Sequence, residues 1–305
     1  MIRITRIDLD NLDVINSGNF GVVYRDNNLA YKIYKDECKT SYGYHYPNPT
    51  KKKRIRRINR MMELDSRLKY TDLCRDIVYV NGDFGGICIP CYDGETLNNL
   101  MNSDFKLKMD ISRQLVRNAK ELTNNCIYPM DYKLNNIMLV DGDVKILDLD
   151  DVFTRYTRIP IPLLKRKSIR ELDDTIKCFF GEHDRYRAYY GKDVERPRYN
   201  IKSSYEGIED YLKEKSKSRK LIIINYSLLN DEVIRYLCGL DGYDVIVTYN
   251  GTKYDDFVAN KYIDDFNKFD RNIFDVVGTK ELEEYLSNFN LEEVLEYKGQ
   301  LVKVR

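Results

Sequence analysis

The segment from Ile127 to Asp148 constrains the fold more than any other part of this 305-residue chain. Its second half holds two short apolar runs, Asn136–Val140 and Val144–Leu147, joined by Asp141-Gly142-Asp143. Because Asp-Gly supplies the positive φ angles of a tight turn, this pattern predicts a β-hairpin. The hairpin would bring Asp148, which follows its second strand, back beside Asn136.

The polar residues of this segment have the types that ATP-dependent phosphoryl transfer requires. Asp131, Lys133 and Asn136 would share one loop, with Asp148 beside them. The reaction needs hard oxygen ligands for Mg²⁺ and an acceptor for the proton of the attacking hydroxyl. We expect Asn136 and Asp148 to bind the metal, Asp131 to orient the hydroxyl and Lys133 to reach the γ-phosphate. A hairpin alone is more often structural, so this interpretation depends on the segment upstream.

Upstream, the segment Ile15–Tyr24 contains a glycine turn flanked by β-prone residues, and a second β-prone run, Leu29–Tyr34, follows it. Gly18 and Gly21 would let backbone N–H groups approach phosphate oxygens without interference from a Cβ atom. Lys32, on the second run, would point toward the same phosphates. A glycine pair alone usually makes only a turn, but its order and distance relative to Asp131 favour a phosphate site.

Together these segments resemble the protein kinase superfamily over about residues 12 to 212. The resemblance implies an α+β, bilobal kinase-like fold, with a β-rich N-lobe at residues 1–90 and a reduced helical C-lobe at 91–214. It implies that ATP and Mg²⁺ are the cofactors and that Gly18, Phe20, Gly21 and Lys32 contact the nucleotide phosphates. It also implies that Ile89, Cys91 and Tyr92 belong to the hinge whose backbone contacts adenine.

A helix is expected between Lys51 and Leu68, where apolar residues recur at helical spacing. The resemblance implies that this helix presents Glu63 to Lys32 as an ion pair, with Asp65 as the alternative partner. The helix begins with the cationic run 51–57, which could bind nucleic acid or an acidic protein. Such a run is more often a solvated face, and we favour that interpretation.

Several positions depart from the kinase pattern. Asn16 replaces the first glycine of the loop, and Met130 replaces the arginine that would pair with a phosphorylated activation loop. Asp150 replaces a flexible glycine after the metal ligand, which favours a permanently inward metal site. Ser168 stands where the family has an aspartate that braces the catalytic loop. We therefore expect activity without activation-loop phosphorylation, and a weakened peptide platform.

Residues 221–305 show a different pattern, in which apolar strands alternate with helices. Strands are predicted at 221–224, 244–248, 274–277 and 300–304, and helices at 231–237, 254–266 and 280–287. Continuous apolar strands between helices predict a small α/β unit with a parallel sheet covered on both faces. The loops after 224 and 248 could form a ligand crevice. No phosphate or nucleophile motif is present, so recognition or scaffolding is as consistent as catalysis.

The amino-acid composition restricts the partners and the location that can be expected. Fifty basic and 49 acidic residues give a formal charge of +1, which predicts no general attraction to nucleic acid or to a membrane. Seven scattered cysteines favour a reducing, cytoplasmic location over a disulfide framework. Cys88-Ile-Pro-Cys91 could be a redox pair or half of a zinc site. The chain has no second such pair and no histidine at ligand spacing, so a buried strand and a linker fit better.

The function predicted is an ATP- and Mg²⁺-dependent phosphotransferase that acts on a Ser or Thr hydroxyl of a protein. By resemblance, Lys133 is typical of Ser/Thr protein kinases. The weakened peptide platform keeps a small-molecule kinase, of aminoglycoside or choline type, as an alternative. A nucleotide-binding pseudokinase that signals through its C-terminal unit is the other alternative. The sequence does not identify the acceptor.

Overall fold

The computed structural model describes residues 2–18, 20–39, 45–47, 51–149, 153–154, 159–181, 203–250 and 273–305. These residues form a mixed α+β protein, as predicted, that divides into two compact units. The first unit contains residues up to Leu100 and from Arg113 to Phe179. The second contains Met101–Ser112 and Glu206–Arg305. Among the helices described, none is long and apolar enough to cross a membrane.

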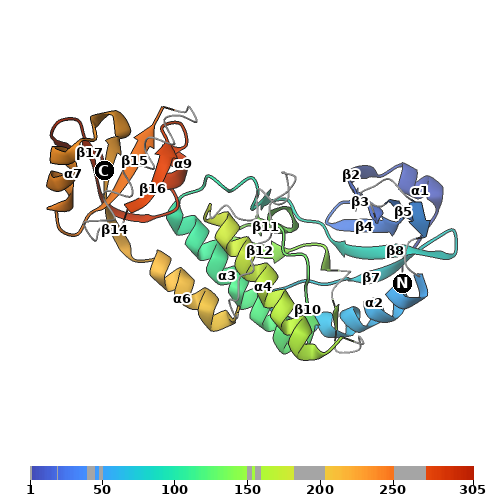
Figure 1. Ribbon diagram of the computed structural model, residues 1–305. Coiled ribbons are helices and arrows are strands. Elements are labelled where there is room, and N and C mark those ends of the chain that lie inside the picture. The colour runs from blue at the N-terminus through green and yellow to red at the C-terminus, as the bar shows by residue number, and fades with distance from the viewer. Residues whose placement is uncertain are drawn as a thin grey trace. The chain divides into compact units, whose positions relative to one another are not determined.

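The first unit contains a six-stranded sheet in the order β1-β7-β8-β4-β3-β2 (Figure 1). Its strands are β1 (Ile2–Ile4), β2 (Asp13–Ser17), β3 (Gly21–Asp26), β4 (Leu29–Tyr34), β7 (Asp76–Val80) and β8 (Asp83–Pro90). The strands pair antiparallel except β1, which lies parallel to β7. The two predicted β-prone runs are therefore confirmed as β2–β3 and β4. Helix α1 (Arg6–Asp10) covers this sheet with the fully buried Leu9.

The expected helix is present as α2 (Lys51–Asp65), and its buried residues are Ile58, Met61 and Leu64. A short antiparallel pair, β5 (Glu37–Lys39) and β6 (His45–Pro47), precedes it.

The predicted hairpin is also present, as β11 (Ile137–Val140) and β12 (Asp143–Ile146). Asp141 and Gly142 take φ angles of 49° and 86°, as the Asp-Gly turn requires. Helix α3 (Phe105–Asn124) holds the hairpin through two side chains. Gln114 donates to the Gly142 carbonyl at 2.9 Å, and Asn118 donates to the Val144 carbonyl at 2.8 Å. The first bond is exposed and the second is buried, and together they hold the hairpin that leads to Asp148.

Four further elements belong to this part of the first unit. Strand β9 (Glu95–Thr96) extends it to three strands, and β10 (Ile127–Tyr128) pairs with β13 (Phe153–Thr154). Helix α4 (Ile161–Phe179) follows, with Leu164, Ile169, Leu172 and Ile176 buried along one face.

The second unit contains a five-stranded sheet in the order β16-β15-β14-β17-β18. Its strands are β14 (Ser218–Asn225), β15 (Asp244–Tyr249), β16 (Ile273–Gly278), β17 (Asn290–Tyr297) and β18 (Leu301–Lys303). The first four are parallel, and β18 runs antiparallel at the edge. Its helices in the described residues include α6 (Tyr205–Lys215), α7 (Asp231–Cys238) and α9 (Leu282–Leu286).

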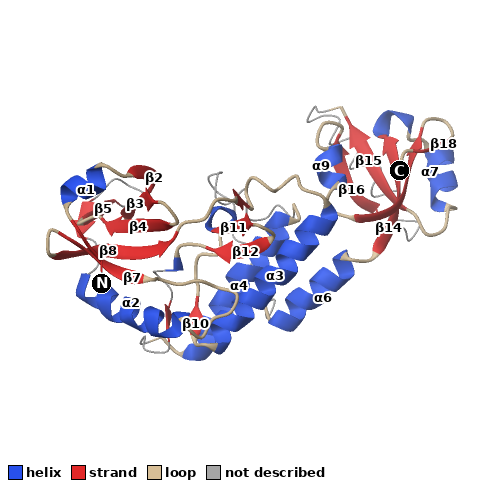
Figure 2. Ribbon diagram, turned by 180° about the vertical axis from the view of Figure 1, so that it is seen from behind, coloured by secondary structure: helices blue, strands red, loops and turns tan. Residues whose placement is uncertain are grey.

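Alternate residues of β14 point into two separate apolar clusters. Ile222 and Ile224 pack with α7, whereas Leu221 and Ile223 pack with α9 (Figure 2). The predicted sheet with both faces covered is therefore confirmed, but it is not parallel throughout, because the strand predicted at 300–304 is the antiparallel edge strand β18. The helix predicted at 254–266 lies outside the described residues.

Strand β17 was not predicted, although it pairs with β14 over most of its length. Its sequence, Asn-Leu-Glu-Glu-Val-Leu-Glu-Tyr, neither alternates nor forms an apolar run. Its acidic residues are accommodated by partners, because Glu292 pairs with Lys220 at 3.2 Å and Glu293 accepts from Tyr243 at 2.5 Å. These partners lie far away in the sequence, so the local hydrophobic pattern does not predict this strand.

Candidate functional site

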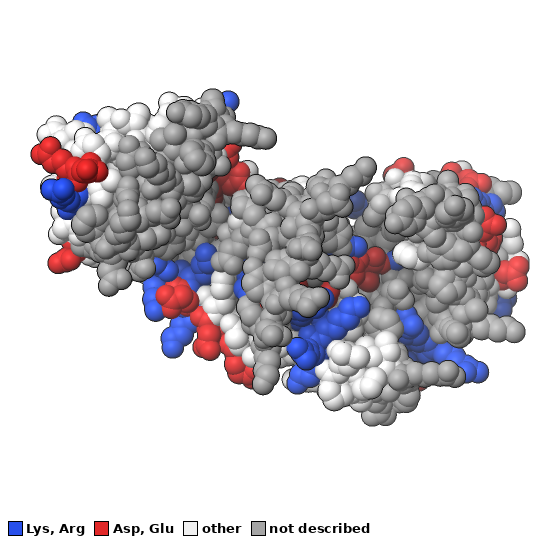
Figure 3. All heavy atoms as spheres, viewed as in Figure 1, with Lys and Arg blue, Asp and Glu red and all other residues white. Residues whose placement is uncertain are grey.

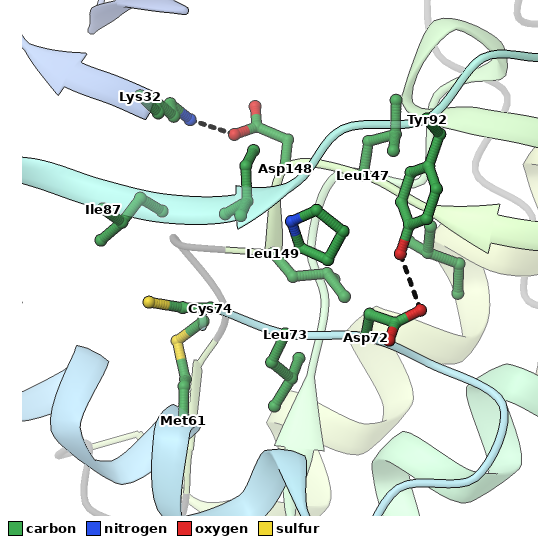
Figure 4. Close-up of a pocket in the computed structure, with 13 residues that line it drawn as sticks. Lys32, Met61, Asp72, Leu73, Cys74, Ile87, Tyr92, Leu147, Asp148 and Leu149 are labelled. Carbon is green, nitrogen blue, oxygen red and sulfur yellow. Dashed lines mark hydrogen bonds and ion pairs between the residues drawn. The ribbon is translucent and has the colours of Figure 1, made fainter. Parts of the chain in front are cut away.

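Lys32 and Asp148 form an ion pair across the first unit. Lys32 lies in the middle of β4, and Asp148 follows β12 by two residues (Figure 4). Asp148 adopts a left-handed backbone conformation with φ of 56°, which aspartate tolerates better than most residues. Unusual backbone geometry of this kind concentrates at functional sites. The structure therefore brings these two predicted site residues together.

Asp131 forms a second polar group with Lys133 and Asn136. Its Oδ2 accepts from Lys133 Nζ at 2.8 Å and from Asn136 Nδ2 at 3.2 Å. A 3₁₀ turn at Leu134–Asn136 brings the three side chains together. The Asn136 carbonyl accepts from the Leu147 amide at 2.7 Å, which places this loop beside the residue before Asp148. The expected neighbourhood of Asn136 and Asp148 is thus confirmed.

Thr175 of α4 braces the loop that carries Asp131. Its hydroxyl contacts the carbonyl of Tyr132, and also that of Glu171 at 2.8 Å. Tyr132 is buried completely, and this burial raises its pKa well above the ordinary value. By resemblance this bracing position was expected at Ser168, which is buried about two turns earlier on the helix. Thr175 was missed because a threonine within a helix carries no motif.

The two glycines of the predicted phosphate-binding turn have different surroundings. A Cβ at Gly21 would lie 2.7 Å from the Ile33 carbonyl oxygen, so the close approach of β3 and β4 requires glycine there. A Cβ at Gly18 would meet nothing within 4 Å, so the space that a phosphate would need is open. Lys35 donates to the Gly18 carbonyl at 2.8 Å and fixes the turn, and Phe20 is exposed at its tip.

Hydrogen bonds and an ion pair connect the predicted hinge to the six-stranded sheet. The Cys91 amide donates to the Asn28 carbonyl at 2.9 Å. Arg25 binds both carboxylate oxygens of Asp93, at 2.7 and 2.6 Å. Ile89 pairs with Ala30 within the sheet. An adenine at this place would have to replace the Cys91 hydrogen bond or use neighbouring groups.

Asp72 connects three elements that the sequence analysis did not link. Its Oδ2 accepts from the Tyr92 hydroxyl at 2.7 Å and from Lys145 Nζ at 3.1 Å, and Arg75 contacts Oδ1 at 2.8 Å. Burial alone would raise the pKa of Asp72, but these hydrogen bonds and the two cations lower it. Asp72 precedes β7, Tyr92 follows β8 and Lys145 lies on β12, so one carboxylate joins the segment after β8 to the hairpin.

A small pocket, partly open to solvent and with a cavity volume of about 40 Å³, lies between these polar groups (Figure 4). Lys32 and Asp148 form one polar end, and Asp72 and Tyr92 form another. Apolar side chains line the space between the two ends, as is usual for small-molecule sites. They are Met61, Leu73, Cys74, Ile87, Ile89, Pro90, Ile146, Leu147 and Leu149.

The expected ion pair between Glu63 and Lys32 is not formed. Glu63 pairs with Arg60 of its own helix at 2.6 Å, and its side chain is 63% exposed. The alternative, Asp65, accepts from the Leu73 amide at 2.7 Å. Met61 lines the pocket instead. Residues two apart on a helix point about 200° apart, so Glu63 cannot share the face of Met61.

No cluster of three or more His, Cys, Asp or Glu side chains suited to a metal ion occurs in the described residues. Asn136 and Asp148 would supply one amide and one carboxylate. Mg²⁺ usually binds through one or two carboxylates together with substrate phosphates, so this pair fits a nucleotide-borne Mg²⁺.

No protein-family model matches this chain, and no curated protein matches it significantly.

Proposed function

We propose that the first unit is a bilobal, kinase-like domain that transfers the γ-phosphoryl group of ATP to a Ser or Thr hydroxyl of a protein. The main support is the contact of Lys32 with Asp148, which lie 116 residues apart. A cation on a strand beside a glycine turn thus contacts a carboxylate held in a left-handed conformation. The Asp131 group lies on the loop next to it.

Each polar residue of the site would have one role in phosphoryl transfer. Lys32 would exchange its contact with Asp148 for a nucleotide phosphate, and Asp148 and Asn136 would hold Mg²⁺, which neutralises charge that develops on the phosphoryl oxygens. Asp131, oriented by Asn136, would accept the proton of the acceptor hydroxyl at its free carboxylate oxygen. Lys133 would screen the transferred group.

The test is phosphoryl transfer by the full chain. We expect label from γ-labelled ATP to appear on Ser and Thr residues of a mixed peptide substrate in the presence of Mg²⁺, and none after its removal with EDTA. Absence of transfer to every acceptor and of ADP formation, with intact folding, would contradict the proposal.

Two observations keep the alternatives open. Helix α4 begins at Ile161, only thirteen positions after Asp148, which leaves little chain for a peptide platform and favours a small-molecule acceptor. The missing Glu63–Lys32 ion pair favours a pseudokinase, because an active protein kinase needs that pair in place. Transfer to aminoglycoside or choline-type acceptors, but not to peptides, would identify the first alternative. Nucleotide binding without turnover would identify the second.

We also propose a cytoplasmic location. Among the described side chains, none of the six cysteines forms a disulfide. Reduced cysteines are usual in a reducing compartment.

A further inference from the structure

The first half of α4 carries a cationic surface that the proposed reaction does not use. Leu163, Arg166, Lys167 and Arg170 follow the spacing i, i+3, i+4, i+7 and therefore share one face. All four are exposed, and so is Lys165. We call the segment Ile159–Arg170 the α4 tip.

Neither ion pairing nor helix stability explains these cations. In the described part of the chain, Lys165, Arg166, Lys167 and Arg170 take part in no ion pair or side-chain hydrogen bond, and the tip contains no acidic residue. The positive end of the helix dipole lies at the N-terminus, so cations in the first turns are unfavourable for the helix itself. The segment adds four positive charges to a chain whose total is +1.

Apolar side chains are exposed beside these cations. Ile159, Ile161 and Leu163 have exposed fractions of 37%, 43% and 56%. Ile161 lies on the same stripe as the buried Ser168 and Leu172, yet it is exposed. The first turn of α4 therefore projects beyond the residues that bury the rest of this stripe. Figure 3 shows an uncharged surface bordered by Lys and Arg at the lower centre, over the lower end of α4 in Figure 1.

We propose that the α4 tip binds the surface of an anionic lipid bilayer. Cations next to a membrane are attracted by anionic headgroups, and exposed aliphatic side chains on the same helix end can enter the interfacial region. A projecting helix end offers no groove for a peptide. The tip also has no aromatic side chain on which bases could stack, and a phosphate backbone would leave Ile159, Ile161 and Leu163 without an apolar partner.

The experiment is co-sedimentation of the full chain with phosphatidylcholine vesicles, with and without phosphatidylserine. We expect binding only to the anionic vesicles, weakened by added salt. The variant with Lys165→Glu, Arg166→Glu, Lys167→Glu and Arg170→Glu should lose at least about tenfold in apparent affinity. Ile161→Ser/Leu163→Ser should also weaken binding, although its remaining cations keep the salt dependence.

The matched control changes four exposed cations elsewhere to Glu, namely Arg67, Lys106, Arg235 and Lys280. This variant has the same net charge as the tip variant and should bind like wild type. Circular dichroism would establish that each variant is folded. Equal loss in tip and control variants, or no wild-type binding to anionic vesicles, would overturn the proposal. Tip-dependent binding to polyglutamate or duplex RNA without vesicle binding would overturn it as well.

Discussion

Lys32 and Asp148 neutralise each other although 116 residues separate them, and Asp148 does so from a left-handed backbone conformation. Asn tolerates this conformation as well as Asp does, so Asp148→Asn removes the charge without adding backbone strain. We expect Asp148→Asn and Lys32→Ala each to reduce phosphoryl transfer more than about tenfold, which corresponds to about 1.4 kcal/mol of barrier. Asp83→Asn, at the exposed first residue of β8, is the control. Unchanged turnover in both site variants would exclude the mechanism.

Asp131 is expected to act on the acceptor and not on the metal. Its carboxylate is already oriented by Lys133 and Asn136, at 2.8 and 3.2 Å. Asp131→Ala should therefore lower kcat and leave the affinity for Mg·ATP nearly unchanged. Steady-state kinetics and nucleotide titration measure the two quantities. A large loss of Mg·ATP affinity would assign the metal to Asp131.

Asp72 makes stability depend on pH in a defined direction. Its pKa is lowered in the folded protein, despite burial, by Tyr92, Lys145 and Arg75. A carboxyl group with a lowered folded pKa stabilises fully above its unfolded value of about 3.9, and the effect is lost as pH falls through the folded pKa. Asp72→Asn should cost about 1–3 kcal/mol in free energy of unfolding at pH 7.

Urea unfolding of wild type and Asp72→Asn at several pH values tests this expectation. The difference between the two proteins should be constant from pH 7 to 5 and should shrink below about pH 4. Tyr92→Phe, which leaves the contacts of Asp72 with Lys145 and Arg75, should cost less. A difference that is independent of pH down to 3 would show that the Asp72 charge does not stabilise the fold.

At the scale of elements, the sequence predicted those that local chemistry determines. The β11–β12 hairpin depends on Asp141-Gly142, and β2, β3, β4 and α2 on periodic apolar residues. The prediction that Glu63 is the partner of Lys32 was wrong. It depended on which face of α2 points toward Lys32, and the sequence alone does not determine that. Strand β17 and the contacts of Asp72 and Thr175 were missed because their partners lie far away in the sequence.

The β10–β13 pair leads to a prediction about regulation. Ile127 pairs with Thr154, so backbone hydrogen bonding connects the segment after Asp148 to the strand before Asp131. Met130 provides no cation for a phosphate there. Thr154→Ala/Thr157→Ala and phosphatase-treated protein should keep the wild-type rate. Thr157, like Asp150, Arg155 and Arg158, lies outside the described residues. Strong dependence on phosphate would mean that another cation, such as Arg170, has replaced the missing arginine.

At the scale of the whole molecule, α3 contributes residues to both compact units, because Met101–Ser112 belong to the second. Within that unit, Lys108 is 1% exposed and donates to Asn288 Oδ1 at 2.6 Å. A chain cut between residues 214 and 221, the boundary predicted from the sequence, would therefore leave these turns of α3 without their partners. The C-terminal unit begins, in structural terms, before residue 221.

The titration of Lys108 tests whether the first turns of α3 pack within the second unit. Burial lowers its pKa to about 8, with Glu284 opposing and Lys215 adding to the effect. Between about 8 and the unfolded value of about 10.4, the unfolded chain binds more protons than the folded one, so stability rises with pH. The free energy of unfolding of wild type should therefore rise relative to Lys108→Met, on the order of 2–3 kcal/mol, between pH 7.5 and 10.5. Urea unfolding at both pH values measures this change, and Lys106→Met, at an exposed position of the same helix, should follow wild type. Parallel pH profiles of wild type and Lys108→Met would mean that the Lys108 amine remains hydrated, and that the first turns of α3 are not packed against the segment around Asn288.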